Sequence, residues 1–94
     1  MFRRFKVSGN SMLPALADGQ YVIGESLTYK FRNPTIGDIV VLKSPNSDMN
    51  LIKRIIKRQD DDYFVEGDNK NESRDSRDFG LIRKENILFR TMLK

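Results

Sequence analysis

Ser11 is placed where a serine hydroxyl could serve as a nucleophile. Gly9 frees the backbone just before it, and Pro14 fixes the chain just after it. Such a turn can point a hydroxyl and a backbone N–H in one direction, which suits a nucleophile with half of an oxyanion hole. A serine near Gly and Asn is also common in ordinary turns, so Ser11 alone predicts little.

Lys53 is a candidate base for that serine. It lies in the apolar-rich run 51–58, where a lysine is ordinarily an edge or snorkelling residue. If buried, its pKa would fall by up to ~3–5 units, and the neutral amine could then take a proton from a serine hydroxyl. The chain has no His and no Cys. This excludes Ser-His-Asp and Cys-His catalysis, disulfides and thiolate or histidine metal sites, so we expect no metal and no cofactor.

Ser73 is the natural third member of such a site. A base that must stay neutral needs a neutral partner to orient it, because a carboxylate in that place would raise the lysine pKa. Ser73 lies in the charged block 67–80, where Asp75 and Arg77 are suited to an ion pair that shapes the loop. By composition the block could equally be a solvated or disordered loop.

The elements that must position these residues are short strands separated by turns, a pattern typical of all-β barrels and sandwiches. The 94 residues predict a single domain, 1–94, with a small coiled sheet and at most one helical turn, at residues 14–17. Residues 51–58 fit a short helix or a strand, and their three isoleucines favour a strand. The other predicted strands are 5–7, 21–23, 38–42, 63–65 and 86–93.

Charge and hydropathy limit the partners. The net charge is +4 but acidic residues are mixed in, so we expect no dedicated nucleic-acid surface. The alternative is a basic binding module built on Lys53, Arg54, Lys57 and Arg58. No apolar run approaches the ~18–20 residues that span a bilayer, which predicts a cytoplasmic protein. Phe2 and Phe5, with the arginines beside them, could instead contact a membrane surface or pack in a first strand.

Four blocks, taken in order, resemble the catalytic core of type I signal peptidases, the membrane-associated Ser-Lys peptidases. The nucleophile block alone is shared with LexA-like self-cleaving repressors, whereas the last block is specific. The blocks are Gly9-Asn10-Ser11-Met12-Leu13-Pro14, Gly37-Asp38-Ile39-Val40-Val41, Lys53-Arg54-Ile55-Ile56, and Gly67 to Gly80.

The resemblance implies a coiled-sheet fold and a role for each site residue. Ser11 is the nucleophile, its backbone N–H binds the oxyanion, Lys53 is the general base, and Ser73 orients Lys53. The supporting residues are Asp68 and Asn69, which brace a turn, and the pair Asp75 and Arg77. The implied substrate-binding residues are Val7, Gly9, Met12, Leu16 and Ile52. Gly9 stands where some family members carry a serine hydroxyl for the oxyanion.

The departures from the family narrow the expected substrate. We expect no counterpart of the family's N-terminal membrane anchor or of the large inserted domain of some members, and the chain resembles most the small soluble nickel-type superoxide dismutase maturation proteases. We therefore expect a serine endopeptidase that removes an N-terminal pro-segment or signal-like peptide from a precursor, with the nickel superoxide dismutase precursor as candidate partner. The alternatives are signal-peptide processing at a membrane, with peripheral contact, or the non-catalytic basic module.

Overall fold

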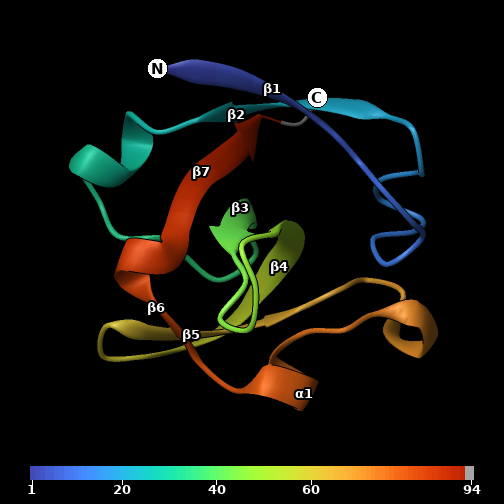
Figure 1. The fold of residues 1–94 in the computed structure, drawn as a ribbon. Helices are drawn as coiled ribbons and strands as arrows, with labels where there is room; N and C mark the ends of the chain where they lie inside the picture. Colours follow the sequence, from blue (N-terminus) through green and yellow to red (C-terminus); the bar gives the residue numbers. More distant parts are fainter. Residues whose placement is uncertain (93–94) are drawn as a thin grey trace.

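The computed structural model describes residues 1–92, which form one curled, seven-stranded antiparallel sheet (Figure 1). The strands lie in the order β1-β2-β7-β3-β4-β5-β6, so the last long strand fills the centre between β2 and β3. This confirms the expected all-β coiled sheet. The strands are β1 (Phe2–Lys6), β2 (Tyr21–Glu25), β3 (Ile39–Lys43), β4 (Asn50–Gln59), β5 (Asp62–Glu66), β6 (Ile82–Arg83) and β7 (Ile87–Met92).

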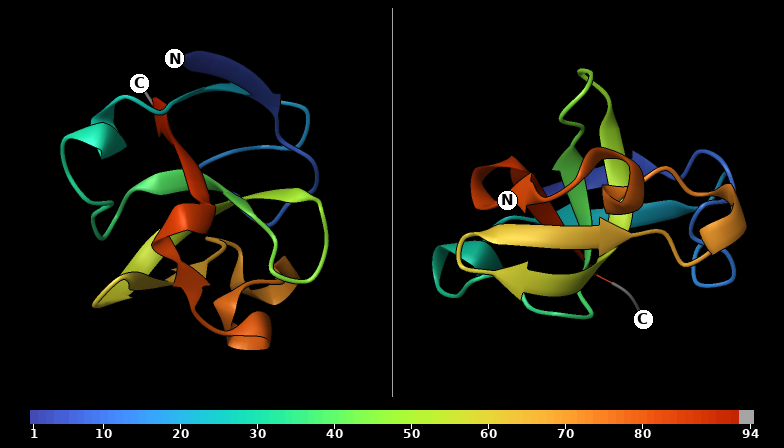
Figure 2. Two further views of the ribbon diagram at one scale, coloured as in Figure 1. Left: turned by 60° about the vertical axis from the view of Figure 1, so that its left-hand side comes forward. Right: turned by 90° about the horizontal axis from the view of Figure 1, so that it is seen from below.

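The curled sheet is an open half-barrel with two apolar clusters (Figure 2). One cluster gathers buried side chains of β3 to β7 around Val40, Leu42 and Tyr63. The other lies near the end of β1 and is formed by Val7, Met12, Leu16, Val22 and Ile39. Alternate residues of β4 serve different clusters, since Leu51 and Ile55 belong with the first and Ile52 with the second.

Helical structure within residues 1–92 is confined to single turns, and these do not lie at the predicted position. Residues 14–17 form hydrogen-bonded turns and no helix, with Leu16 N–H donating to the Met12 carbonyl. Of the helical turns described, only the one at Ser76–Phe79 has a side-chain cap, a capping box of Asp75 and Asp78. The helical turns are η1 (Thr28–Lys30), η2 (Lys70–Glu72), α1 (Ser76–Phe79) and η3 (Lys84–Asn86).

The ambiguous run 51–58 is part of the strand β4. Its pairing with β5 shifts register between Ile55 and Lys57, which marks a bulge at Ile56. The first apolar pair, Leu51 and Ile52, reflects packing on both faces of the strand, since the two residues belong to different clusters. The predicted strand 86–93 corresponds to β7, and Leu93 lies outside the described residues.

The sheet ends at β1 and β6, and the start of β4 also has an unpaired edge within residues 1–92. β1 pairs only with β2. β4 pairs with β3 along residues 50–54, but its pairing with β5 begins only at Arg54. The stretch 50–53 therefore has one free edge, and so does β1.

The two N-terminal phenylalanines have different surroundings. Phe5 packs against the second cluster and against Phe89, with ring centroids 5.2 Å apart. Of the two roles considered for Phe5, packing in the first strand thus holds, and membrane contact does not. Phe2 is exposed. Across residues 1–92, no helix has both the length and the apolar character needed to cross a membrane.

Candidate active site

Lys53 is a buried lysine whose amine has a single hydroxyl partner. Its side chain comes from the middle of β4, and the residue is only 4% exposed. The Nζ atom donates a hydrogen bond to Ser73 Oγ at 3.0 Å. Burial lowers the pKa of Lys53, and the nearby charge of Asp75 offsets this in part. The environment thus favours the neutral amine.

Ser73 has every hydrogen-bonding position in use. Its hydroxyl donates to Asp75 Oδ2 at 2.7 Å and accepts from Lys53 Nζ and from the backbone N–H of Gly67 at 3.1 Å. Because its one proton is committed to Asp75, Ser73 can only accept from Lys53. The lone pair of a neutral Lys53 therefore remains free for another proton.

Asp75 holds the loop that carries Ser73. Its carboxylate is fully buried and takes two hydrogen bonds from the Arg77 guanidinium, each 3.0 Å long. It also accepts from Gly67 N–H at 2.9 Å and forms a capping box with Asp78 at the start of α1. Burial alone would raise the pKa of Asp75, but these hydrogen bonds outweigh it and hold the pKa well below its usual range.

The charged loop is joined directly to the turn that carries Ser11. Asn69 donates its backbone N–H to the Ser11 carbonyl at 2.8 Å and its side-chain amide to the Asn10 carbonyl at 3.0 Å. Figure 1 shows this blue turn and the orange loop on the same side of the molecule. Gly67 lies between them, since a Cβ there would meet both Ser73 Oγ and, at 2.6 Å, the Ser11 carbonyl oxygen.

Asp68 braces the same loop against β4. Its carboxylate accepts two hydrogen bonds of 2.9 Å from the Arg54 guanidinium. This pairing also bears on the basic module considered as an alternative. With Lys53 buried and Arg54 paired to Asp68, only Lys57 and Arg58 of that patch remain exposed.

Ser11 and Lys53 line one cavity of about 180 Å³. Ser11 is half-buried, and no hydrogen bond joins its hydroxyl to Lys53 Nζ among the described residues. Catalytic hydrogen bonds often form only once substrate is bound, so the lack of this bond does not argue against proton transfer. The backbone N–H of Ser11 has no partner within residues 1–92 and is available to an oxyanion.

The residues expected to bind substrate separate into two groups. Val7, Met12 and Ile52 line the cavity with Ser11 and Lys53. Leu16 lies in the second apolar cluster and borders a different cavity, and Gly9 lines neither. Sequence reasoning missed five lining residues, of which Ser8 adds a hydroxyl and the others extend the cavity along β1 and β4; they are Lys6, Ser8, Met49, Asn50 and Leu51.

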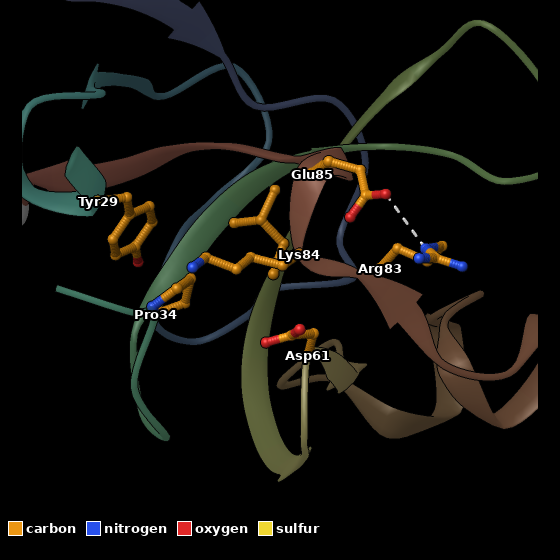
Figure 3. Close-up of a pocket in the computed structure, with 7 residues that line it drawn as sticks. Tyr29, Pro34, Asp61, Arg83, Lys84 and Glu85 are labelled. Carbon is orange, nitrogen blue, oxygen red and sulfur yellow. Dashed lines mark ion pairs between the residues drawn. The ribbon is translucent and has the colours of Figure 1, made fainter.

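A second cavity, of about 300 Å³, lies between η3 and the loop after η1 (Figure 3). Arg83 and Glu85 form an ion pair of 3.2 Å at its rim, and Lys84 donates to Asn33. None of the predicted site residues lines it.

Comparison with known families accounts for the whole chain. The sequence model of the family described as signal peptidase, peptidase S26, matches residues 1–58 and 57–94. The chain belongs to this signal peptidase family. The two matched segments meet at residues 57–58, close to the tight hairpin between β4 and β5.

Several curated relatives of this signal peptidase family member are processing enzymes. It is 32% identical to mitochondrial ATP-independent inner membrane protease subunit 1b of Arabidopsis thaliana, over 79% of this chain and 58% of that protein. It is 37% identical to signal peptidase I of Aquifex aeolicus (71% and 27%) and 29% identical to probable thylakoidal processing peptidase 2 of Arabidopsis thaliana (94% and 36%). The chain spans from 27% to 66% of the length of such relatives.

Proposed function

We propose that this chain is a serine endopeptidase in which Ser11 is the nucleophile and Lys53 the general base. The observation that carries the proposal is the buried Lys53 amine, held by Ser73 at 3.0 Å and lining the same cavity as Ser11. Membership of the signal peptidase family supports it. A lysine with a lowered pKa is suited to act as a base near neutral pH.

The proposed reaction has two steps. Lys53 Nζ takes the proton of Ser11 Oγ as that oxygen attacks the scissile carbonyl, and the Ser11 N–H binds the oxyanion. Lys53 then returns the proton to the leaving nitrogen, and the carbonyl carbon stays bonded to Ser11 as an ester. In the second step, Lys53 takes a proton from water as that water attacks the ester carbonyl, and returns it to Ser11 Oγ as the bond between Ser11 and the carbonyl carbon breaks.

The free edges of β1 and of residues 50–53 support a peptide substrate in extended conformation. The cavity is bordered by residues 6–8 at the end of β1 and by residues 49–53 at the start of β4. A peptide lying between these edges could form main-chain hydrogen bonds with both. Its side chain before the scissile bond would meet Val7, Met12 and Ile52, three apolar residues of a cavity of about 180 Å³ in which a small residue would fit.

The substrate we propose is a precursor protein cleaved near its N-terminus. The relatives' names describe processing peptidases and signal peptidases. Within this class, the precursor of nickel superoxide dismutase is the specific candidate, and only the resemblance to the small maturation proteases supports it.

Co-expression with a candidate precursor tests the proposal. Wild type should release a shortened precursor, detected by mass spectrometry, whereas Ser11→Ala and Lys53→Met should leave it intact. Lys57→Met is the matched control, because Lys57 is an exposed lysine on the same strand. Full cleavage by either dyad variant would refute the mechanism. An uncut nickel superoxide dismutase precursor, with other precursors cut, would remove only that substrate.

A second candidate, signal-peptide removal at a membrane surface, is favoured by one face of the sheet. The register of β1 with β2 puts Phe2, Arg4 and Lys6 on the same face as Tyr21 and Ile23. Phe2 is 67% and Tyr21 54% exposed, so aromatic and basic groups share this surface. Co-sedimentation with anionic vesicles, lost in Phe2→Ser with Arg4→Glu, would support it. Equal recovery without vesicles would count against it.

A further inference from the structure

We propose that a cavity beside the tip of the β3–β4 hairpin binds an acidic side chain of the substrate on the leaving-group side of the scissile bond. This cavity, of about 350 Å³, is separate from the one that contains Ser11. It is lined by Ser44, Asn46, Ser47, Met49, Leu51, Arg74 and Phe79. The inference rests on the proposed function and adds a preference that the dyad does not imply.

The two cavities adjoin each other. Met49 and Leu51 line both of them, so a peptide in the first cavity can extend into the second without leaving the protein surface. The hairpin tip projects from the sheet and forms one wall (Figure 2). Met49 is 66% exposed, which is more than an ordinary core methionine would be.

The position of Lys53 indicates which part of the substrate enters the second cavity. Lys53 must pass its proton to the leaving nitrogen, so that nitrogen comes within hydrogen-bond reach of Nζ. Nζ is held on the side of Ser73, and the next residue along the chain is Arg74. Because Arg74 lines the second cavity, which shares Met49 and Leu51 with the first, we place the leaving segment towards Arg74.

The two cavities also differ in the apolar cluster against which their residues pack. Leu51 packs with Ile55 and Phe79 in the first apolar cluster, two residues from Lys53 on the same face of the strand. Ile52 packs in the second cluster, with the residues that line the cavity for the side chain before the scissile bond. Phe79, which lines the second cavity, thus packs against a different cluster from Val7 and Met12, which line the first.

Arg74 determines the preferred chemistry. It is exposed and forms no ion pair within residues 1–92, whereas Arg54 and Arg77 on the same side of the molecule are both paired. Leu51, Phe79 and Met49 provide apolar walls for the methylene groups of an aspartate or glutamate. The carboxylate would then complete a guanidinium pair that the protein itself leaves open.

Peptide series that differ only after the scissile bond test the inference. Each of the first three leaving-side positions would carry Asp, Asn or Lys in turn, and kcat/KM would be measured with wild type, Arg74→Ala, Arg74→Glu and the control Arg83→Ala. At one position we expect Asp to exceed Asn by about fivefold, the size of a partly exposed ion pair. The preference should vanish in Arg74→Ala, favour Lys in Arg74→Glu, and persist in Arg83→Ala.

The outcomes separate this inference from the proposed function. Cleavage with the same Asp, Asn and Lys ratios in wild type and Arg74→Glu would overturn the inference and leave the dyad in place. Absence of cleavage of every peptide would count against the dyad. In that case, binding of fluorescent leaving-side product peptides to Ser11→Ala decides the inference, since equal affinity for the Asp and Lys peptides would overturn it.

Discussion

Lys53 and Asp75 are joined through a single hydroxyl and not directly. Ser73 Oγ accepts from Lys53 Nζ at 3.0 Å and donates to Asp75 Oδ2 at 2.7 Å. A buried carboxylate in direct contact would stabilise the ammonium and raise the pKa of Lys53. Asp75 fixes the position of the Ser73 hydroxyl, and this hydroxyl orients the Lys53 amine. The Asp75 carboxylate is not in direct contact with the amine, and burial still lowers the pKa of Lys53.

Replacing Ser73 should therefore change both the rate and its pH dependence. In Ser73→Ala, Lys53 loses its acceptor and Asp75 becomes the nearest acidic group, so the pKa of Lys53 should rise. We expect kcat to fall by about 10²-fold with KM little changed, and the activity to require higher pH. A pH–rate profile measures both effects. Ser26→Ala is the control, and a profile for Ser73→Ala that matches wild type would contradict the prediction.

Lys53→Met should stabilise the fold, and the gain should depend on pH. Because burial lowers the pKa of Lys53 from 10.5, the unfolded chain holds this proton more tightly than the folded one. Below the folded pKa, the native state bears the full cost of a buried ammonium. Between the folded pKa and 10.5, the unfolded state binds more protons, so the stability of wild type rises with pH.

Urea denaturation of wild type and Lys53→Met at about pH 6 and about pH 10 would measure this difference. The stability gain should be larger at the lower pH and shrink as the pH rises. Lys57→Met, at an exposed position, should show no such trend. A gain that grows with pH would show that Lys53 is stabilised as the ammonium.

Gly67→Ala should lower catalytic activity more than it lowers the stability of the fold. The added Cβ would overlap Ser73 Oγ and lie 2.6 Å from the Ser11 carbonyl oxygen, so the two proposed catalytic segments must move apart. We expect a loss of at least about 10²-fold in kcat/KM, because small displacements of catalytic groups are costly. Thermal unfolding measured alongside distinguishes displacement from loss of fold. Wild-type activity would show that the loop adapts freely.

Asn69→Ala should weaken catalysis through the position of the nucleophile. It removes the hydrogen bond of 3.0 Å to the Asn10 carbonyl, beside Ser11, and leaves the backbone bond to Ser11 in place. We expect a fall in kcat of about fivefold, the effect of one hydrogen bond of about 1 kcal/mol. Asn71→Ala is a matched control, since Asn71 is exposed in the same loop. Equal rates for the two variants would refute a positioning role for Asn69.

Part of this structure could be predicted from sequence because the chemistry leaves few options. Without His or Cys, a buried lysine and an orienting hydroxyl are the remaining elements of a serine hydrolase site, and Lys53 and Ser73 are indeed bonded. The strands were predictable because β-branched runs alternate with turn residues. The loop 67–80 is folded by Asp75, whose bonds to Gly67 and Arg77 are local in sequence.

The other features of the fold and the site could not be predicted, because they depend on residues that are neighbours in space but distant in sequence. Leu16 was expected in the substrate cavity, but curling of the sheet places it in the cluster behind Val7 and Met12. Leu51 and Ile52 pack on opposite faces of β4, and such consecutive apolar residues also fit a helical period. Met49 and Arg74 line one cavity because the β3–β4 hairpin and the loop 67–80, which are distant in sequence, lie close together.

The unpaired edges of β1 and of residues 50–53 have a consequence for the protein without substrate. An open strand edge is a template for pairing with another copy of the same chain, and thus for aggregation. β1 carries Arg3, Arg4 and Lys6, so two β1 edges would bring like charges together. The repulsion between these side chains opposes pairing of two β1 edges. Neutralising them should make the protein associate with itself at concentrations where wild type stays monomeric.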